Sequence, residues 1–131
     1  MIINQQLLDE LTALAKESPS LRVYRDLRNC PSDDSQRMLD AIEPGSLLPI
    51  HRHPMSSETI AILRGHLRVS FYDPGKRVTE VVDLIAGGDV VALDVPIGQW
   101  HKAEAMESGT VIMLMKDGRY RPTRQEAIME I

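Results

Sequence analysis

The sequence contains few aromatic residues, with one Trp, one Phe and three Tyr among 131 positions. A surface that stacks nucleic-acid bases needs several such rings. The formal net charge of −4 also argues against a basic surface that could bind DNA or RNA. We therefore expect no nucleic-acid partner and a core built mainly from aliphatic side chains.

Cysteine is nearly absent, since Cys30 is the single one. A lone cysteine cannot form an internal disulfide, which fits a reducing compartment. No stretch approaches the roughly 18 apolar residues of a membrane span. The N-terminal MIINQQLLDEL lacks the charged and apolar blocks of a signal peptide. We expect a cytoplasmic protein with no membrane partner.

The overall composition, with 43% apolar and 26% charged residues, is typical of one soluble domain, which we expect to span residues 1–131. Residues 4–17 predict a helix that Asn4 caps. Its apolar positions share one stripe at helical spacing. They are Leu7, Leu8, Leu11, Leu14 and Ala15. We expect this helix to pack on the outside of a barrel.

After the helix, the local pattern changes to β. Residues 21–30 predict a strand that buries Leu21, Val23 and Tyr24, followed by a loop over 30–34. Residues 36–43 fit a strand or a short helix, and we favour a strand. Three arginines in this region can be interpreted in two ways. They are either solvated surface charges or a binding site for an anionic substrate. They are Arg22, Arg25 and Arg28.

The remaining chain predicts short strands separated by Gly and Pro turns. Their ranges are 47–53, which Pro49 interrupts, 59–63, 66–72, 78–85, 90–95, 100–105 and 110–116. Leu67, Val69 and Phe71 alternate on one face, and the Asp73–Lys76 turn predicts a hairpin. This spacing is typical of a β-sandwich or barrel. Residues 123–131 fit a short terminal helix.

Three histidines and one glutamate form a candidate metal site. His51 and His53 point to the same side if their segment is extended, roughly 6.6 Å apart along it. Proline at 49 and 54 favours that conformation. We expect Glu58 to begin the next strand, which runs back beside the first, and His101 to come from elsewhere in the barrel.

Such ligands suit one divalent transition metal, namely Mn, Fe, Ni, Zn, Cu or Co. An octahedral ion would keep two positions open for water, substrate or dioxygen, whereas a tetrahedral ion could be closed and structural. His66, beside a turn and on the outward side of its strand, is expected to be an ordinary polar residue.

These residues resemble the first cupin motif, G-x5-H-x-H-x3,4-E-x6-G. The matching positions are Gly45, His51, His53, Glu58 and Gly65. The second motif, G-x5-P-x-G-x2-H-x3-N, is met in part at Pro96, Gly98 and His101. Gly88 lies two residues too far upstream, and Ala105 stands in place of the asparagine.

More narrowly, the chain resembles the WbuC family of cupin-fold metalloproteins. The resembling segments are QRMLDAIEPGS, HRHP, ILRGHL, GQWH and KDGRYRP. The resemblance implies a double-stranded β-helix, the cupin jelly-roll barrel, with a helical extension over residues 1–20 and a barrel core over 36–122. It also implies a metal held by His51, His53, Glu58 and His101, and a link to bacterial surface polysaccharides. Cys30 and Pro31 replace a histidine that usually follows the asparagine at 29 in that family.

Three functions remain open for this site. The first is a metalloenzyme that acts on a small polar molecule such as a sugar or sugar nucleotide, by isomerase, epimerase or lyase chemistry, with dioxygenase chemistry as a variant. The second is a binding module for a carbohydrate or small acid, and the third is a metal that only stiffens the barrel. Candidate proton-transfer or anion-binding groups are Tyr120, Tyr24, Cys30, Arg37 and Lys116. The resemblance allows a homodimer, in which helix 4–17 either joins the interface or covers its own barrel.

Overall fold

The computed structural model describes residues 1–119 and 128–129, and it begins with the helix α1 (Gln5–Glu17). The side chain of Asn4 caps this helix by accepting a 3.0 Å hydrogen bond from the Leu7 backbone N–H, as the sequence predicts. Leu14, however, is 54% exposed. The predicted apolar stripe is therefore too wide, and its buried part faces the sheet through Leu8, Leu11 and Ala15.

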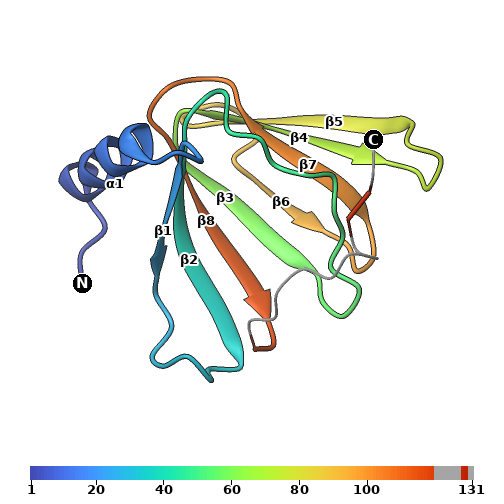
Figure 1. Cartoon of the computed structure of the whole chain (residues 1–131), viewed down its shortest axis with the longest axis horizontal. Helices are drawn as coiled ribbons and strands as arrows, with labels where there is room; N and C mark the ends of the chain where they lie inside the picture. The colour runs from blue at the N-terminus through green and yellow to red at the C-terminus, as the bar shows by residue number, and fades with distance from the viewer. Residues whose placement is uncertain (120–127, 130–131) are drawn as a thin grey trace.

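The rest of the described chain is mainly two antiparallel sheets. The first, in spatial order, consists of β1 (Arg22–Asp26), β2 (Ser35–Ile42), β8 (Thr110–Asp117), β3 (Glu58–Arg64) and β6 (Ala92–Val95). The second consists of β5 (Val78–Ile85), β4 (His66–Tyr72) and β7 (Trp100–Ala105). Figure 1 shows α1 on the β1 side of the molecule, with β4, β5 and β7 on the opposite side.

Alternation along the strands gives the five-stranded sheet two apolar faces. On β2, Leu39 and Ala41 pack with α1, whereas Ile42 belongs to the core between the sheets. On β8, Val111 packs with α1, and Ile112 belongs to the core between the sheets. Because successive side chains of a strand point to opposite faces, one sheet supports both the helix and the interior of the barrel.

The hairpin prediction is confirmed, since β4 and β5 occupy 66–72 and 78–85 and pair antiparallel. Leu67 and Val69 are fully buried, as their alternation predicts. The preference for a strand over 36–43 is also confirmed by β2. Tyr24 was expected to be buried but is 56% exposed, because β1 is at the edge of its sheet and pairs with β2 alone among the described strands.

The predicted strand over 47–53 is wrong as a regular strand. Only His51 forms bridges there, to His101 and to Ile128, because Pro49 has no N–H to contribute to a ladder. The predicted pairing of β3 with this segment is also wrong, since β3 lies between β6 and β8. The predicted helix over 123–131 lies outside the described residues except at 128–129, where Met129 donates a 2.8 Å backbone hydrogen bond to Ile50.

Within the described residues, α1 is too short and too polar to cross a membrane, and no other helix is present that could do so.

Candidate metal centre

Two of the candidate histidines are joined through their backbones. The N–H of His51 donates to the carbonyl of His101 at 3.0 Å, and the N–H of His101 donates to the carbonyl of His51 at 2.9 Å. These two reciprocal bonds are those of a hydrogen-bonded residue pair in an antiparallel bridge. The bridge places the two imidazole ring centroids 4.3 Å apart, although 50 residues separate the two histidines in the sequence.

His53 and Glu58 complete the cluster. The carbonyl of His53 accepts a 2.9 Å hydrogen bond from the N–H of Gly98, in the turn that leads to His101. The candidate ligand nitrogens of the three histidines all lie within 4.8 Å of one another. Glu58 begins β3 and is 8% exposed, with Oε2 3.1 Å from His53 Nε2 and Oε1 3.8 Å from His101 Nε2.

Backbone carbonyls orient two of the rings. Nδ1 of His51 lies 3.1 Å from the carbonyl oxygen of Pro49, and Nδ1 of His101 lies 2.9 Å from that of Gln99. Because a carbonyl only accepts, each Nδ1 carries the ring proton and each Nε2 keeps a free lone pair. This is the usual outer support of a metal-binding histidine.

The environment also favours the protonation states that a metal requires. Burial, together with the neighbouring His101, lowers the pKa of His51 to about 4. Burial alone would raise the pKa of Glu58, but the imidazoles of His101 and His53 outweigh it and hold that pKa below its usual value. A neutral imidazole and an ionised carboxylate are the ligand forms of these groups.

The buried nitrogens fit a metal ion. In the described part of the chain, Nε2 of His53 and Nε2 of His101 are buried and have no hydrogen-bond partner, since their approaches to Glu58 lack hydrogen-bond geometry. Buried polar atoms are normally satisfied, so each exception requires an explanation. A cation shared by the three imidazoles and the carboxylate would satisfy both nitrogens.

The cluster forms part of the lining of a cavity of about 420 Å³, to which strands of both sheets contribute. Apolar side chains form another part of the lining, among them Met38, Ile42, Ile60, Ile112 and Leu114. Polar side chains line the rest, namely Arg22, Tyr24, Asp26, Arg28, Gln36 and Asp40 from β1, β2 and the loop between them. The cavity is therefore larger than a metal site alone would need.

Arg22 and Asp40 form a buried ion pair in this cavity. Asp40 is 0% exposed, and Arg22 Nε lies 2.9 Å from each of its carboxylate oxygens. Burial raises the pKa of Asp40, while the hydrogen bond from Arg22 acts against that rise. The Arg22 guanidinium also lies 4.6 Å from the centre of the Tyr24 ring. Sequence reasoning missed this pair. Its one signal was an aspartate inside the apolar run MLDAI.

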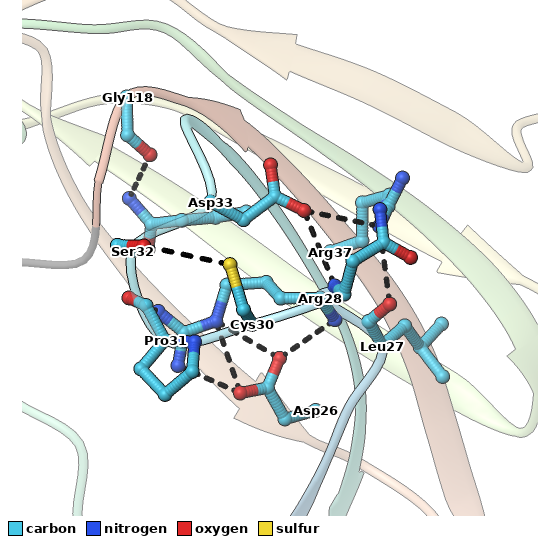
Figure 2. Close-up of polar contacts among 11 residues, drawn as sticks. Asp26, Leu27, Arg28, Cys30, Pro31, Ser32, Asp33, Arg37 and Gly118 are labelled. Atoms are coloured by element: carbon cyan, nitrogen blue, oxygen red, sulfur yellow. Dashed lines mark hydrogen bonds and ion pairs between the residues drawn. The ribbon is translucent and has the colours of Figure 1, made fainter.

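The predicted catalytic candidates divide into three groups. Tyr24 and Lys116 line the cavity. Cys30 and Arg37 lie instead in the polar network of the β1–β2 loop, where Arg37 donates to the carbonyl of Leu27 at 3.1 Å (Figure 2). Tyr120 lies outside the described residues.

Lys116 contacts one of the candidate ligand histidines. Its Nζ lies 3.3 Å from Nδ1 of His53. Burial lowers the pKa of Lys116, and the charge of Glu58 opposes that change. His66, in contrast, lies away from the cluster and pairs with Asp83 at 2.8 Å.

Comparison with solved structures shows the cupin fold. KdgF from Halomonas sp. matches with a TM-score of 0.62 at 16% identity, over 79% of this chain and 84% of that one. The capsular polysaccharide assembling protein CapF from Staphylococcus aureus matches with a TM-score of 0.60 at 19% identity, over 76% of this chain and 27% of that one. Bacillus subtilis oxalate decarboxylase, described as having Mn(II) centres, matches with a TM-score of 0.59 at 21% identity, over 84% of this chain and 28% of that one.

These likenesses confirm the predicted jelly-roll architecture with an N-terminal helix. The chain spans less than a third of the Staphylococcus and Bacillus proteins. No curated protein matches the sequence. A family model matches residues 3–84, which include three of the four candidate ligands and α1. The chain belongs to the family described as a domain of unknown function (DUF6016).

Proposed function

We propose that this protein is a metalloenzyme that acts on a small polar molecule within the cavity. One divalent transition metal, Mn, Fe, Ni, Zn, Cu or Co, would be held by His51, His53, Glu58 and His101. The strongest support is the pair of buried Nε2 atoms of His53 and His101, which have no hydrogen-bond partner and belong to residues that line a cavity large enough for a ligand. A site that only stiffened the barrel would not need this adjoining space.

A bound metal would supply Lewis acidity toward an oxygen atom of the substrate. The chain's own residues would do the rest. The carbonyls of Pro49 and Gln99 keep the lone pairs of His51 and His101 facing the cavity. Aliphatic side chains such as Ile60 and Ile112 exclude water around the reacting groups. Lys116 and Tyr24 are the described polar candidates for holding an anion or a proton there.

The substrate class that we favour is a sugar or sugar nucleotide, with isomerase, epimerase or lyase chemistry. The resemblance to the WbuC family and the likeness to a capsular polysaccharide assembling protein both support a role in bacterial surface polysaccharides. The polar lining that β1 and β2 contribute offers donors and acceptors that hydroxyl groups could use, among them Arg22, Gln36 and Asp40.

The test compares metal-loaded protein, chelated protein and His101→Ala. Each is incubated with a panel of sugars, sugar acids and sugar nucleotides, and products are followed by proton NMR. We expect turnover only with the loaded wild-type protein. Line broadening of a panel member without turnover would favour a binding module instead. Consumption that requires dioxygen would favour the dioxygenase variant. Equal turnover by His101→Ala would contradict metal catalysis.

A further inference from the structure

Lys116 occupies a position from which it can reach both the candidate metal ligands and the cavity. It lies on β8 directly opposite Glu58 of β3 and opposite Gln36 of β2. It lines the same cavity as Ile112 and Leu114, which precede it at alternate positions on the strand. Its ammonium group lies 3.3 Å from Nδ1 of His53. The Lys116 side chain therefore lies in the part of the cavity that the candidate metal ligands line.

The charge balance of the cavity makes Lys116 different from the other cations that line it. Arg22 pairs with Asp40, and Arg28 pairs with Asp26 at 2.7 Å. Lys116 makes no ion pair with a carboxylate among residues 1–119 and 128–129. Glu58 on the neighbouring strand acts on this ammonium group only from beyond ion-pair distance, and a partly buried charge without a direct ion pair costs free energy. An anionic group of a ligand would remove that cost.

The contact with His53 does not replace such a counter-charge. If Nε2 of His53 holds the proposed metal, its ring proton resides on Nδ1. Nδ1 and the ammonium of Lys116 are then both donors, and two donors cannot hydrogen-bond to each other. Lys116 would be left to find an acceptor in the cavity beside the metal.

Another part of the cavity lining, level with Ile112 rather than with Lys116 on β8, is chemically different. Arg22 and Asp40 largely neutralise each other there, yet their atoms line the space. A carboxylate oxygen has more than one acceptor position, and a guanidinium has five N–H donors. A hydroxyl group both donates and accepts, so it can hydrogen-bond to such a pair without adding charge.

We propose that the ligand is a small polyhydroxylated carboxylic acid, whose carboxylate binds Lys116 and whose hydroxyl groups reach Arg22 and Asp40. This inference rests on the proposed function, because the metal cluster forms one wall of the site. It adds to that function the acidic character of the ligand and the residue that selects it.

The test uses three six-carbon probes that differ in one feature each. Gluconate has the carboxylate and the hydroxyl groups, glucitol has only the hydroxyl groups, and hexanoate has only the carboxylate. Calorimetric titration of the metal-loaded protein should show gluconate binding about tenfold or more tighter than either of the others, because a hydrogen bond to a charged group is worth that much.

Lys116→Met removes the charge but keeps the length of the side chain. It should reduce gluconate affinity to that of glucitol, and Lys116→Arg should retain much of the preference. Lys16→Met, at an exposed position on α1, makes the same change in net charge and should leave all three affinities unchanged. Circular dichroism establishes that each variant folds, and Lys116→Gln replaces Lys116→Met if that variant does not.

Several results would overturn the proposal. They are no gluconate binding, equal binding of gluconate and glucitol, equal binding of gluconate and hexanoate, or an undiminished gluconate preference in Lys116→Met. A Lys116-dependent preference in a protein whose turnover of the sugar panel is the same with and without metal would support the acid site and contradict the proposed metal-dependent function. The two ideas can therefore fail separately.

Discussion

The protonation state of His51 is set by the residues packed around it. A free imidazole has a pKa near 6.5, whereas burial and the neighbouring His101 lower the pKa of His51 to about 4. Between these two values the unfolded chain binds a proton that the folded chain excludes. Folding stability therefore rises with pH across this window and is lost as pH falls through it.

The first prediction concerns this loss in metal-free protein. In the presence of a chelator, the free energy of unfolding should drop by about 2–3 kcal/mol between pH 7 and pH 4. Urea denaturation at both pH values measures it. His51→Gln is the control and should show a clearly smaller drop. An equal drop in this variant would show that the imidazole is not the group responsible.

The second residue-scale prediction concerns the buried ion pair of Arg22 and Asp40. Arg22→Met leaves a fully buried carboxylate unpaired, which should destabilise the fold by about 3–5 kcal/mol. Arg25→Met, at an exposed position on the same strand, should change stability little. The double variant Arg22→Met, Asp40→Leu should recover most of the loss, because no charge remains buried. Urea denaturation that gave equal stability for the two single variants would contradict a buried pair.

At the scale of elements, the turn between β3 and β4 depends on Gly65. Its φ is +87°, a conformation that side chains disfavour. A Cβ added there would also lie 2.7 Å from the backbone Cα of Thr110, too close to be relieved by a side-chain rotation. The hydroxyl of that threonine accepts from the N–H of His66, so the crowded turn also fixes the start of β4.

The third prediction follows from that crowding. Gly65→Ala should cost about 3 kcal/mol or more, from backbone strain and overpacking together. Gly87→Ala is a matched control, because its φ is +76° and a Cβ added there would meet nothing within 4 Å. It should cost only the backbone strain, about 1–2 kcal/mol. Similar thermal denaturation of the two variants would contradict the role assigned to Thr110.

Sequence reasoning worked for elements whose local signals are strong. The alternation of Leu67 and Val69, with the turn at Asp73–Lys76, was enough to predict the bounds of β4 and β5. It failed at His51, where Pro49 prevents a regular ladder and one bridge to His101 does the positioning.

The residues of the candidate site were likewise predicted only in part from the sequence. Motif spacing identified the cluster of His51, His53, Glu58 and His101, and the structure brings these side chains together. The pair of Arg22 and Asp40 could not be predicted, because it depends on the register of β1 against β2. Residues that are 18 positions apart meet only when that register is known.

At the scale of the whole molecule, the two faces of the five-stranded sheet have different roles. Its outer face packs on α1 through Leu39, Ala41 and Val111. Its inner face supplies much of the cavity lining, including Glu58 and Asp40. Stability that comes from the helix side therefore does not compete for the space that a ligand needs.

The most direct test of the central claim is the amount of metal bound per chain, measured by plasma mass spectrometry after equilibrium dialysis. We predict one divalent transition-metal ion per wild-type chain. Affinity should fall by at least about a hundredfold in His51→Ala and His101→Ala, more than the loss of an outer partner of a ligand costs. His66→Ala should bind as the wild type does, because His66 pairs with Asp83 away from the cluster. A wild-type chain that retained no metal, or equal binding by His101→Ala and His66→Ala, would contradict the metal centre.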